Sequence, residues 1–208
     1  RADLPVIATI YSPLTTAYKL AGPALLTHIA QCPAQVHKAL GVLADITVAY
    51  AQKSIQLGVD GFFFASQLAN GTLMTETAYK EFGENYDLIV LESYVKKTLF
   101  NVVHIHGENA MFETLANYPV NCLSWHDRWI GPSLLKARKV TDKCLLGGID
   151  EENVFGALTD TAFAQHVREA LDMGGTKGFI LGPGCTASPN MPNNHLEIIT
   201  EQLRTHHL

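Results

Sequence analysis

The chain has 208 residues, of which 47% are hydrophobic and 17% are charged, and its formal net charge is −5. This composition is typical of a well-packed domain and excludes a disordered chain. The acidic balance argues against nucleic acid as a partner, and no apolar run approaches the roughly 18 residues that a membrane-spanning helix needs. We therefore expect a single domain over residues 1–208, with no nucleic-acid or membrane partner.

Six short runs rich in β-branched or aromatic residues predict strands, and segments with helical periodicity separate them. The strands are expected at residues 6–11, 61–65, 101–106, 121–125, 144–149 and 178–182. Helices are expected within residues 36–58 and 160–175, because apolar residues recur there every three to four positions. Continuous apolar strands that alternate with amphipathic helices indicate βα units around a parallel sheet.

Six βα units fit either an open doubly wound sheet or part of an eight-stranded barrel. A doubly wound dinucleotide-binding sheet carries a glycine-rich phosphate loop after its first strand, and no such loop follows residues 6–11. An eight-stranded barrel needs two more units than this chain supplies. We therefore expect an incomplete (β/α)8 TIM barrel that lacks its first two units.

The four cysteines of the chain are scattered, without the CxxC spacing of common metal and redox motifs, at positions 32, 122, 144 and 185. In a chain of this size, that pattern favours reduced thiols in a cytoplasmic protein over a disulfide framework.

The third predicted strand ends in two histidines, His104 and His106, that are one residue apart. Side chains alternate between the faces of a strand, so these two imidazoles share a face, which is the geometry of a chelate. A buried core histidine beside a surface histidine would give the same pattern. Zinc accepts histidine nitrogen and cysteine sulfur, and Cys185 after the last strand is the natural third ligand, unless it is only a small residue in a tight turn.

Further polar residues follow the other strands, where the chemistry of parallel α/β folds gathers. After the fourth strand, Asp127 could orient His126 or take a substrate proton, and Arg128 could bind a carboxylate. A local salt bridge is the alternative for these residues. Asp150 could bind substrate, cap the following helix or do both, and Gln67 lies at the end of the second strand.

These strand ends resemble those of the uroporphyrinogen decarboxylase superfamily over nearly the whole chain. The matching segments are YSPLTTAYKLAG after the first strand, VVHIHG, GGID, and the closing GPGCTASPNMPNNHLEIITEQL. Members of this family are (β/α)8 barrels of considerably greater length. The resemblance therefore implies that the chain corresponds to the last six units of such a barrel.

One branch of the family consists of decarboxylases that act on a tetrapyrrole without a metal or cofactor. Tyr18 matches a tyrosine of their site, whereas Pro183 stands where they have a histidine. Proline offers no hydrogen-bond donor. The aspartate and the arginines of their early strands have no counterpart in this chain. The resemblance to this branch thus implies a site without several of its working groups.

The other branch consists of corrinoid-dependent and thiol methyltransferases, which bind zinc through His-x-Cys and through the cysteine of Pro-Gly-Cys. His104 and Cys185 match the first and last of these ligands, and His106 replaces the middle cysteine. A set of two histidines and one cysteine still suits zinc, which activates a thiol by stabilising its thiolate. Glu108 is a candidate fourth ligand or a partner that fixes an imidazole tautomer.

We therefore expect a zinc-dependent methyltransferase that moves a methyl group between a corrinoid, carried by a partner protein, and a small thiol or similar acceptor. One alternative is cofactor-free uroporphyrinogen decarboxylation in porphyrin biosynthesis. Another is an inactive fragment or partner subunit that forms a homo-oligomer through an open barrel edge. The candidate residues beyond the metal ligands are catalytic Tyr18, His126 and Asp127, and substrate-binding Gln67, Arg128 and Asp150.

Overall fold

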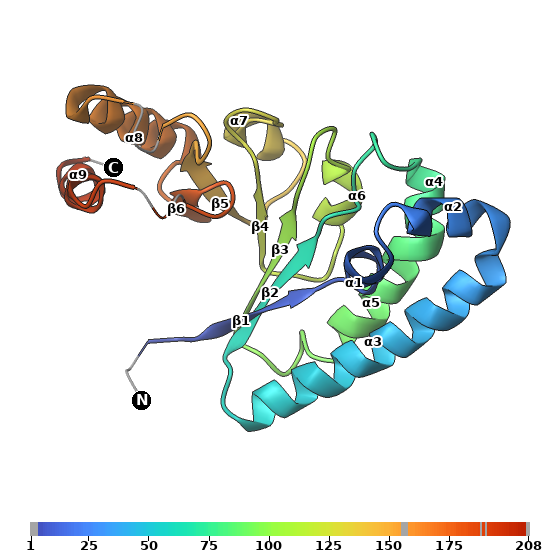
Figure 1. Ribbon diagram of the computed structural model, residues 1–208. Helices are drawn as coiled ribbons and strands as arrows, with labels where there is room; N and C mark the ends of the chain where they lie inside the picture. The colour runs from blue at the N-terminus through green and yellow to red at the C-terminus, as the bar shows by residue number, and fades with distance from the viewer. Residues whose placement is uncertain (1–3, 155–157, 188, 190, 207–208) are drawn as a thin grey trace. The chain divides into compact units, whose positions relative to one another are not determined.

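The structure is a computed structural model, and it describes residues 4–154, 158–187, 189 and 191–206. Strands and helices alternate along the chain (Figure 1). In chain order the elements are β1 (Ile7–Tyr11), α1 (Pro13–Ala21), α2 (Ala24–Gln31), α3 (Pro33–Gln56), β2 (Gly61–Ser66), α4 (Glu76–Tyr79), the π-helix η1 (Lys80–Glu84), α5 (Asn85–Glu92), β3 (Phe100–Ile105), α6 (Phe112–Ala116), β4 (Cys122–Trp125), α7 (Leu134–Ala137), β5 (Cys144–Ile149), α8 (Asp160–Gly174), β6 (Phe179–Pro183) and α9 (Asn194–Thr205).

The six strands form one sheet whose order, β1 to β6, follows the chain without a crossover. The pairs β1–β2, β2–β3 and β5–β6 are parallel. In the middle pair Ala65 lies opposite His104, and in the last pair Ile149 lies opposite Pro183. Sequential parallel pairing with a helical connection after each strand is the pattern of a βα barrel, as the sequence predicts.

Helix boundaries follow local chemistry. At the start of α1, Ser12 Oγ accepts a hydrogen bond from the Thr15 amide at 3.1 Å, and Pro13 takes the first helical position. At the start of α8, Thr159 caps in the same way. That helix ends at Gly175, whose φ of 73° lies in the left-handed region that favours glycine. The predicted helix at 160–175 is therefore confirmed.

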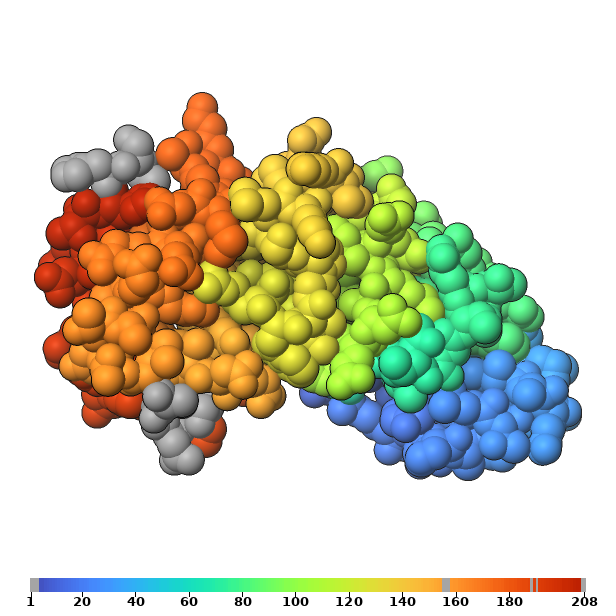
Figure 2. All heavy atoms as spheres, turned by 90° about the horizontal axis from the view of Figure 1, so that it is seen from above, coloured from blue at the N-terminus to red at the C-terminus, as the bar shows by residue number. Residues whose placement is uncertain are grey.

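The chain divides into two compact units, the first ending at Cys122 and the second beginning at Leu123. In the first unit α3 packs against α1 and α5, and β2 is flanked by β1 and β3. Figure 2 shows the atoms of α2 and α3 in blue at the surface of this unit. Its buried core includes Leu14, Leu40, Phe62, Phe64, Val90 and Val103.

A polar cluster lies inside the first unit. Asp87 of α5 is fully buried, and its Oδ2 accepts hydrogen bonds from the hydroxyls of Tyr79 at 2.7 Å and Tyr118 at 2.9 Å. Ser66, at the end of β2, lies 3.0 Å from the Tyr79 hydroxyl. Burial raises the pKa of Asp87 to about 7, against the opposing effect of the two tyrosine hydrogen bonds.

In the second unit α8 packs against β5, β6 and α9. The buried residues of its core are Ile149, Val154, Phe163, Val167 and Leu171. In the part of the chain that the structure describes, no helix is both long and apolar enough to cross a membrane.

Candidate metal centre

The two histidines of β3 behave as the strand period predicts. His104 is the fifth residue of the strand and is 4% exposed, and its ring stacks on Phe63 of β2 at a centroid distance of 5.3 Å. His106 follows directly after the strand, and its amide donates to the Ser66 carbonyl at 3.0 Å. The two imidazole centroids are 5.9 Å apart, so both rings lie on the same side of the strand end.

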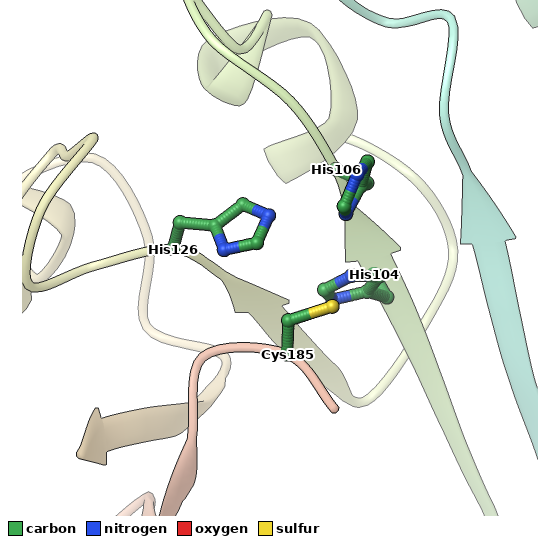
Figure 3. Close-up of side chains that lie close together, drawn as sticks. All are labelled: His104, His106, His126 and Cys185. Atoms are coloured by element: carbon green, nitrogen blue, oxygen red, sulfur yellow. The ribbon is translucent and has the colours of Figure 1, made fainter. Parts of the chain in front are cut away.

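Two further side chains complete a group of four potential metal ligands. His126 follows β4, and Cys185 follows β6 by two residues. Each of the four residues His104, His106, His126 and Cys185 offers one ligand atom, and these atoms all lie within 4.8 Å of one another. Figure 3 shows the three rings and the thiol directed toward a common centre. His104 and His126 are buried, whereas His106 and Cys185 are half-buried.

The donor set and its spacing fit a metal ion. Zinc bonds to histidine nitrogen and cysteine sulfur are about 2.0–2.3 Å long, so a tetrahedral arrangement places ligand atoms roughly 3.3–3.8 Å apart. The 4.8 Å limit on the separations in the group is about 1 Å beyond this range, a difference that small side-chain rotations can remove. Three imidazoles and one thiol are borderline-soft donors, which suit zinc and disfavour magnesium or calcium. The group could therefore hold a metal ion.

The ring of His126 is hydrogen-bonded to Glu151 and not to Asp127, one of whose roles suggested by the sequence was to orient it. The Nδ1–H of His126 donates to Glu151 Oε1, and both side chains are buried. The indole Nε1–H of Trp129 donates to the same oxygen at 3.1 Å. Burial raises the pKa of Glu151, but the hydrogen bonds from His126, from its own amide and from Trp129 outweigh burial and leave that pKa below its usual value.

Asp127 is engaged in a different contact. It is 4% exposed, and its Oδ1 accepts from the Gly148 amide of β5 at 2.9 Å. The same oxygen of Asp127 lies 2.4 Å from the position of an ideal Cβ at Gly147, so any side chain at residue 147 would collide with the carboxylate. Burial raises the pKa of Asp127 to about 6, although the Gly148 amide and the Arg128 charge oppose this rise.

Arg128 and Asp150, the expected substrate-binding residues, bond within the chain. The Nη2 of Arg128 donates to His166 Nδ1 at 2.9 Å and lies 3.3 Å from Glu169 Oε2, both on α8. This ion pair joins Arg128 to a residue 41 positions away, so it differs from the local salt bridge within the loop that the sequence left open as an alternative. Asp150 Oδ1 accepts from the amides of Glu152 and Asn153, so it caps the turn that follows β5. Burial, and then the Arg128 charge, lower the pKa of His166 to about 4.

The remaining predicted residues lie in the first unit. Tyr18 is half-buried in α1, and Gln67 follows β2, where its amide donates to Thr15 Oγ1 at 2.9 Å. Glu108 is exposed and is not a member of the group of four, in which His126 supplies the fourth ligand atom. Sequence reasoning therefore singled out three of the four members as ligands and assigned the fourth, His126, to catalysis.

These features define a class of protein: an α/β fold of the TIM-barrel type in which histidine and cysteine side chains from several strand ends form a potential metal-binding group. The sequence pattern of the uroporphyrinogen decarboxylase (URO-D) family matches residues 1–206. The chain therefore belongs to the URO-D family, which confirms the resemblance seen in its strand ends.

Three individual proteins that are similar to this chain illustrate the family and the fold. The methylcobamide:CoM methyltransferase MtbA of Methanosarcina acetivorans is 22% identical over 204 residues, which are 96% of this chain and 58% of that protein. A methyltransferase structure from Methanosarcina mazei superposes with a TM-score of 0.81 at 20% identity, over 97% of this chain and 59% of that one.

A B12-independent methionine synthase from Shewanella sp. W3-18-1 superposes with a TM-score of 0.56 at 18% identity, over 80% of this chain and 55% of that one. The two structural similarities confirm the fold class. The chain spans less than two thirds of the length of each of these three proteins.

Proposed function

We propose that this protein is a zinc-dependent methyltransferase of the URO-D family. In this proposal it moves a methyl group between a corrinoid, carried by a partner protein, and a small thiol. The observation that carries the proposal is the group of His104, His106, His126 and Cys185, whose ligand atoms lie within 4.8 Å of one another. Neither three imidazoles nor a thiol is needed by a cofactor-free decarboxylase, whereas both are zinc ligands.

His104, His106 and Cys185 would hold the zinc ion, and His126 would be the fourth donor. A bound zinc ion supplies a positive charge that keeps a thiol deprotonated near neutral pH, and the thiolate is the species that attacks a methyl group. A catalytic zinc site keeps one position for substrate. A substrate thiol would take the place of His126 in this donor set, which would leave Nε2 of His126 able to accept a proton.

In this proposal Nε2 of His126 would accept the proton of the acceptor thiol. Glu151 is suited to support that step, because its carboxylate receives the Nδ1–H and stabilises a positively charged imidazole. His126 thus keeps the catalytic role that the sequence suggested, with Glu151 as its partner.

The choice of substrates rests on a relative. MtbA carries a name that specifies methyl transfer between a methylcobamide and CoM, and it aligns with 96% of this chain. We extend that chemistry to this chain by class only: a methylated corrinoid as donor and a small thiol as acceptor. The zinc-loaded protein offered methylcobalamin and coenzyme M tests the proposal.

The expected result is loss of the methylcobalamin absorption band at a rate that depends on protein, and equal loss of free thiol. Cys185→Ala should abolish the reaction. The matched control is Cys32→Ala, which makes the same change at a half-buried cysteine at the end of α2 and should leave the reaction intact. Carbon dioxide release from uroporphyrinogen by metal-free protein, unchanged in Cys185→Ala, would contradict the proposal and favour the decarboxylase alternative.

A further inference from the structure

The buried carboxylate of Glu151 contacts His126, a member of the metal-binding group. Glu151 follows β5 and is 7% exposed, and the side chain is buried among β4, the loop after it and the turn after β6. A buried charge is costly unless it is hydrogen-bonded, so its two oxygens must be accounted for separately.

One oxygen holds an imidazole. Oε1 of Glu151 accepts from Nδ1 of His126 and from Nε1 of Trp129. Because an ionised carboxylate only accepts hydrogen bonds, Nδ1 must carry the ring proton, which leaves the lone pair of the neutral ring on Nε2. Trp129 also meets the imidazole edge-on, at a centroid distance of 5.0 Å and an angle of 60°. The tautomer and orientation of His126 are thereby defined.

The other oxygen, Oε2, packs against the turn that contains Gly184 and Cys185. An ideal Cβ at Gly184 would lie 2.7 Å from Glu151 Oε2 and 2.8 Å from the Trp125 carbonyl oxygen. The Gly184 amide also donates to the carbonyl of Ile149, two residues before Glu151, at 3.1 Å. The turn can approach the carboxylate this closely only because residue 184 has no side chain.

We infer that Glu151 is a positioning residue of the metal centre, which orients His126 through Oε1 and packs against the Cys185 turn through Oε2. The inference rests on the proposed metal site. A carboxylate behind a ligating histidine fixes its tautomer and makes it a better ligand, and loss of such a partner weakens metal binding about 10- to 100-fold.

The test compares Glu151→Ala and Glu151→Gln with Glu152→Gln, which makes the same chemical change at the exposed neighbouring residue. Zinc affinity is measured by competition with a chromophoric chelator. We expect binding to be about 100-fold weaker in Glu151→Ala and about 10-fold weaker in Glu151→Gln, whose amide oxygen still accepts from Nδ1. Glu152→Gln should bind as the unmodified protein does.

A second measurement separates positioning from general destabilisation. Nitrogen-15 NMR of the metal-free protein reports which ring nitrogen of His126 carries the proton. The Nδ1–H tautomer should dominate in the unmodified protein and in Glu151→Gln, and it should lose that dominance in Glu151→Ala. If folded Glu151→Ala keeps this tautomer and an unchanged zinc affinity, the inference is overturned.

The two proposals fail in different ways. Absence of zinc binding by the unmodified protein would overturn the metal site, and the tautomer measurement would still decide whether Glu151 orients His126. If Glu151→Ala does not fold, Glu151→Gln carries the test: zinc affinity equal to that of Glu152→Gln would overturn the inference.

Discussion

Asp87 gives the first unit a stability that depends on pH, and Asp87→Asn should remove that dependence. The carboxyl group is fully buried, and both tyrosine hydrogen bonds reach the same oxygen, Oδ2. Among the described residues, none is within hydrogen-bond distance of Oδ1. The nearby charge of Glu84 adds to the effect of burial and also raises the pKa of Asp87. An asparagine of the same shape carries no charge at any pH, and its amide oxygen can accept both tyrosine bonds.

The sign and size of the pH effect on the free energy of unfolding follow from the pKa of Asp87. This pKa is about 7 in the folded protein and about 3.9 in an unfolded chain. Between these values the folded state keeps a proton that the unfolded state releases. The contribution of Asp87 is therefore fully present below about pH 4 and is lost as the pH rises through 7, by up to about 1.4 kcal/mol per pH unit. Over the whole interval the free energy of unfolding should fall by roughly 4 kcal/mol because of this group alone.

The assay is urea unfolding followed by far-UV circular dichroism at pH 4.5, 6 and 8, with a chelator present so that metal binding does not contribute. At pH 4.5 Asp87→Asn should be less stable by about 1–3 kcal/mol, because its amide nitrogen places two N–H donors without an acceptor where the protonated carboxyl places one O–H. At pH 8 the difference should shrink or reverse. Asp45→Asn, at an exposed acid on α3, is the matched control and should run parallel to the unmodified protein. If the free energy of unfolding of Asp87→Asn changes with pH in parallel with that of the unmodified protein, the reasoning is refuted.

Two further substitutions test the metal centre. Cys185→Ala should reduce bound zinc from about one per chain to nearly none, as measured by elemental analysis, whereas Cys32→Ala should retain it; equal zinc in both variants would exclude Cys185 as a ligand. Gly184→Ala should lower the free energy of unfolding by about 1–3 kcal/mol and weaken zinc binding, because its new methyl group would meet Glu151 Oε2 at 2.7 Å. Gly41→Ala, at a helical position with nothing within 4 Å of the added Cβ, should not be destabilised, and a loss equal to that of Gly184→Ala would show that the contact at Glu151 is unimportant.

The strands and main helices could be predicted from sequence because their signals are local. The run at residues 61–65 is almost entirely apolar, as expected for a strand covered on both faces, and it became β2. The chelate at the end of β3 was equally accessible, because the period of a strand alone places His104 and His106 on one face. These inferences need no knowledge of distant contacts.

The partner of His126 could not be predicted in the same way. Sequence proximity suggested Asp127, but adjacent side chains at a strand end point in opposite directions, and Asp127 instead accepts from Gly148. Glu151 is 25 residues away, and only the packing of separate strand ends brings its carboxylate to the imidazole. Three acidic residues, Asp150, Glu151 and Glu152, follow β5 and were the available signal, but no local pattern favours Glu151 over the other two.

Metal analysis of the purified protein tests the proposed function most directly. The protein is prepared in zinc-containing medium, freed of loosely bound ions by gel filtration and measured by inductively coupled plasma mass spectrometry. The group of His104, His106, His126 and Cys185 predicts about one zinc ion per chain, retained against buffer exchange. A folded protein that holds no zinc, and takes up none when zinc is added at neutral pH, would contradict the proposal.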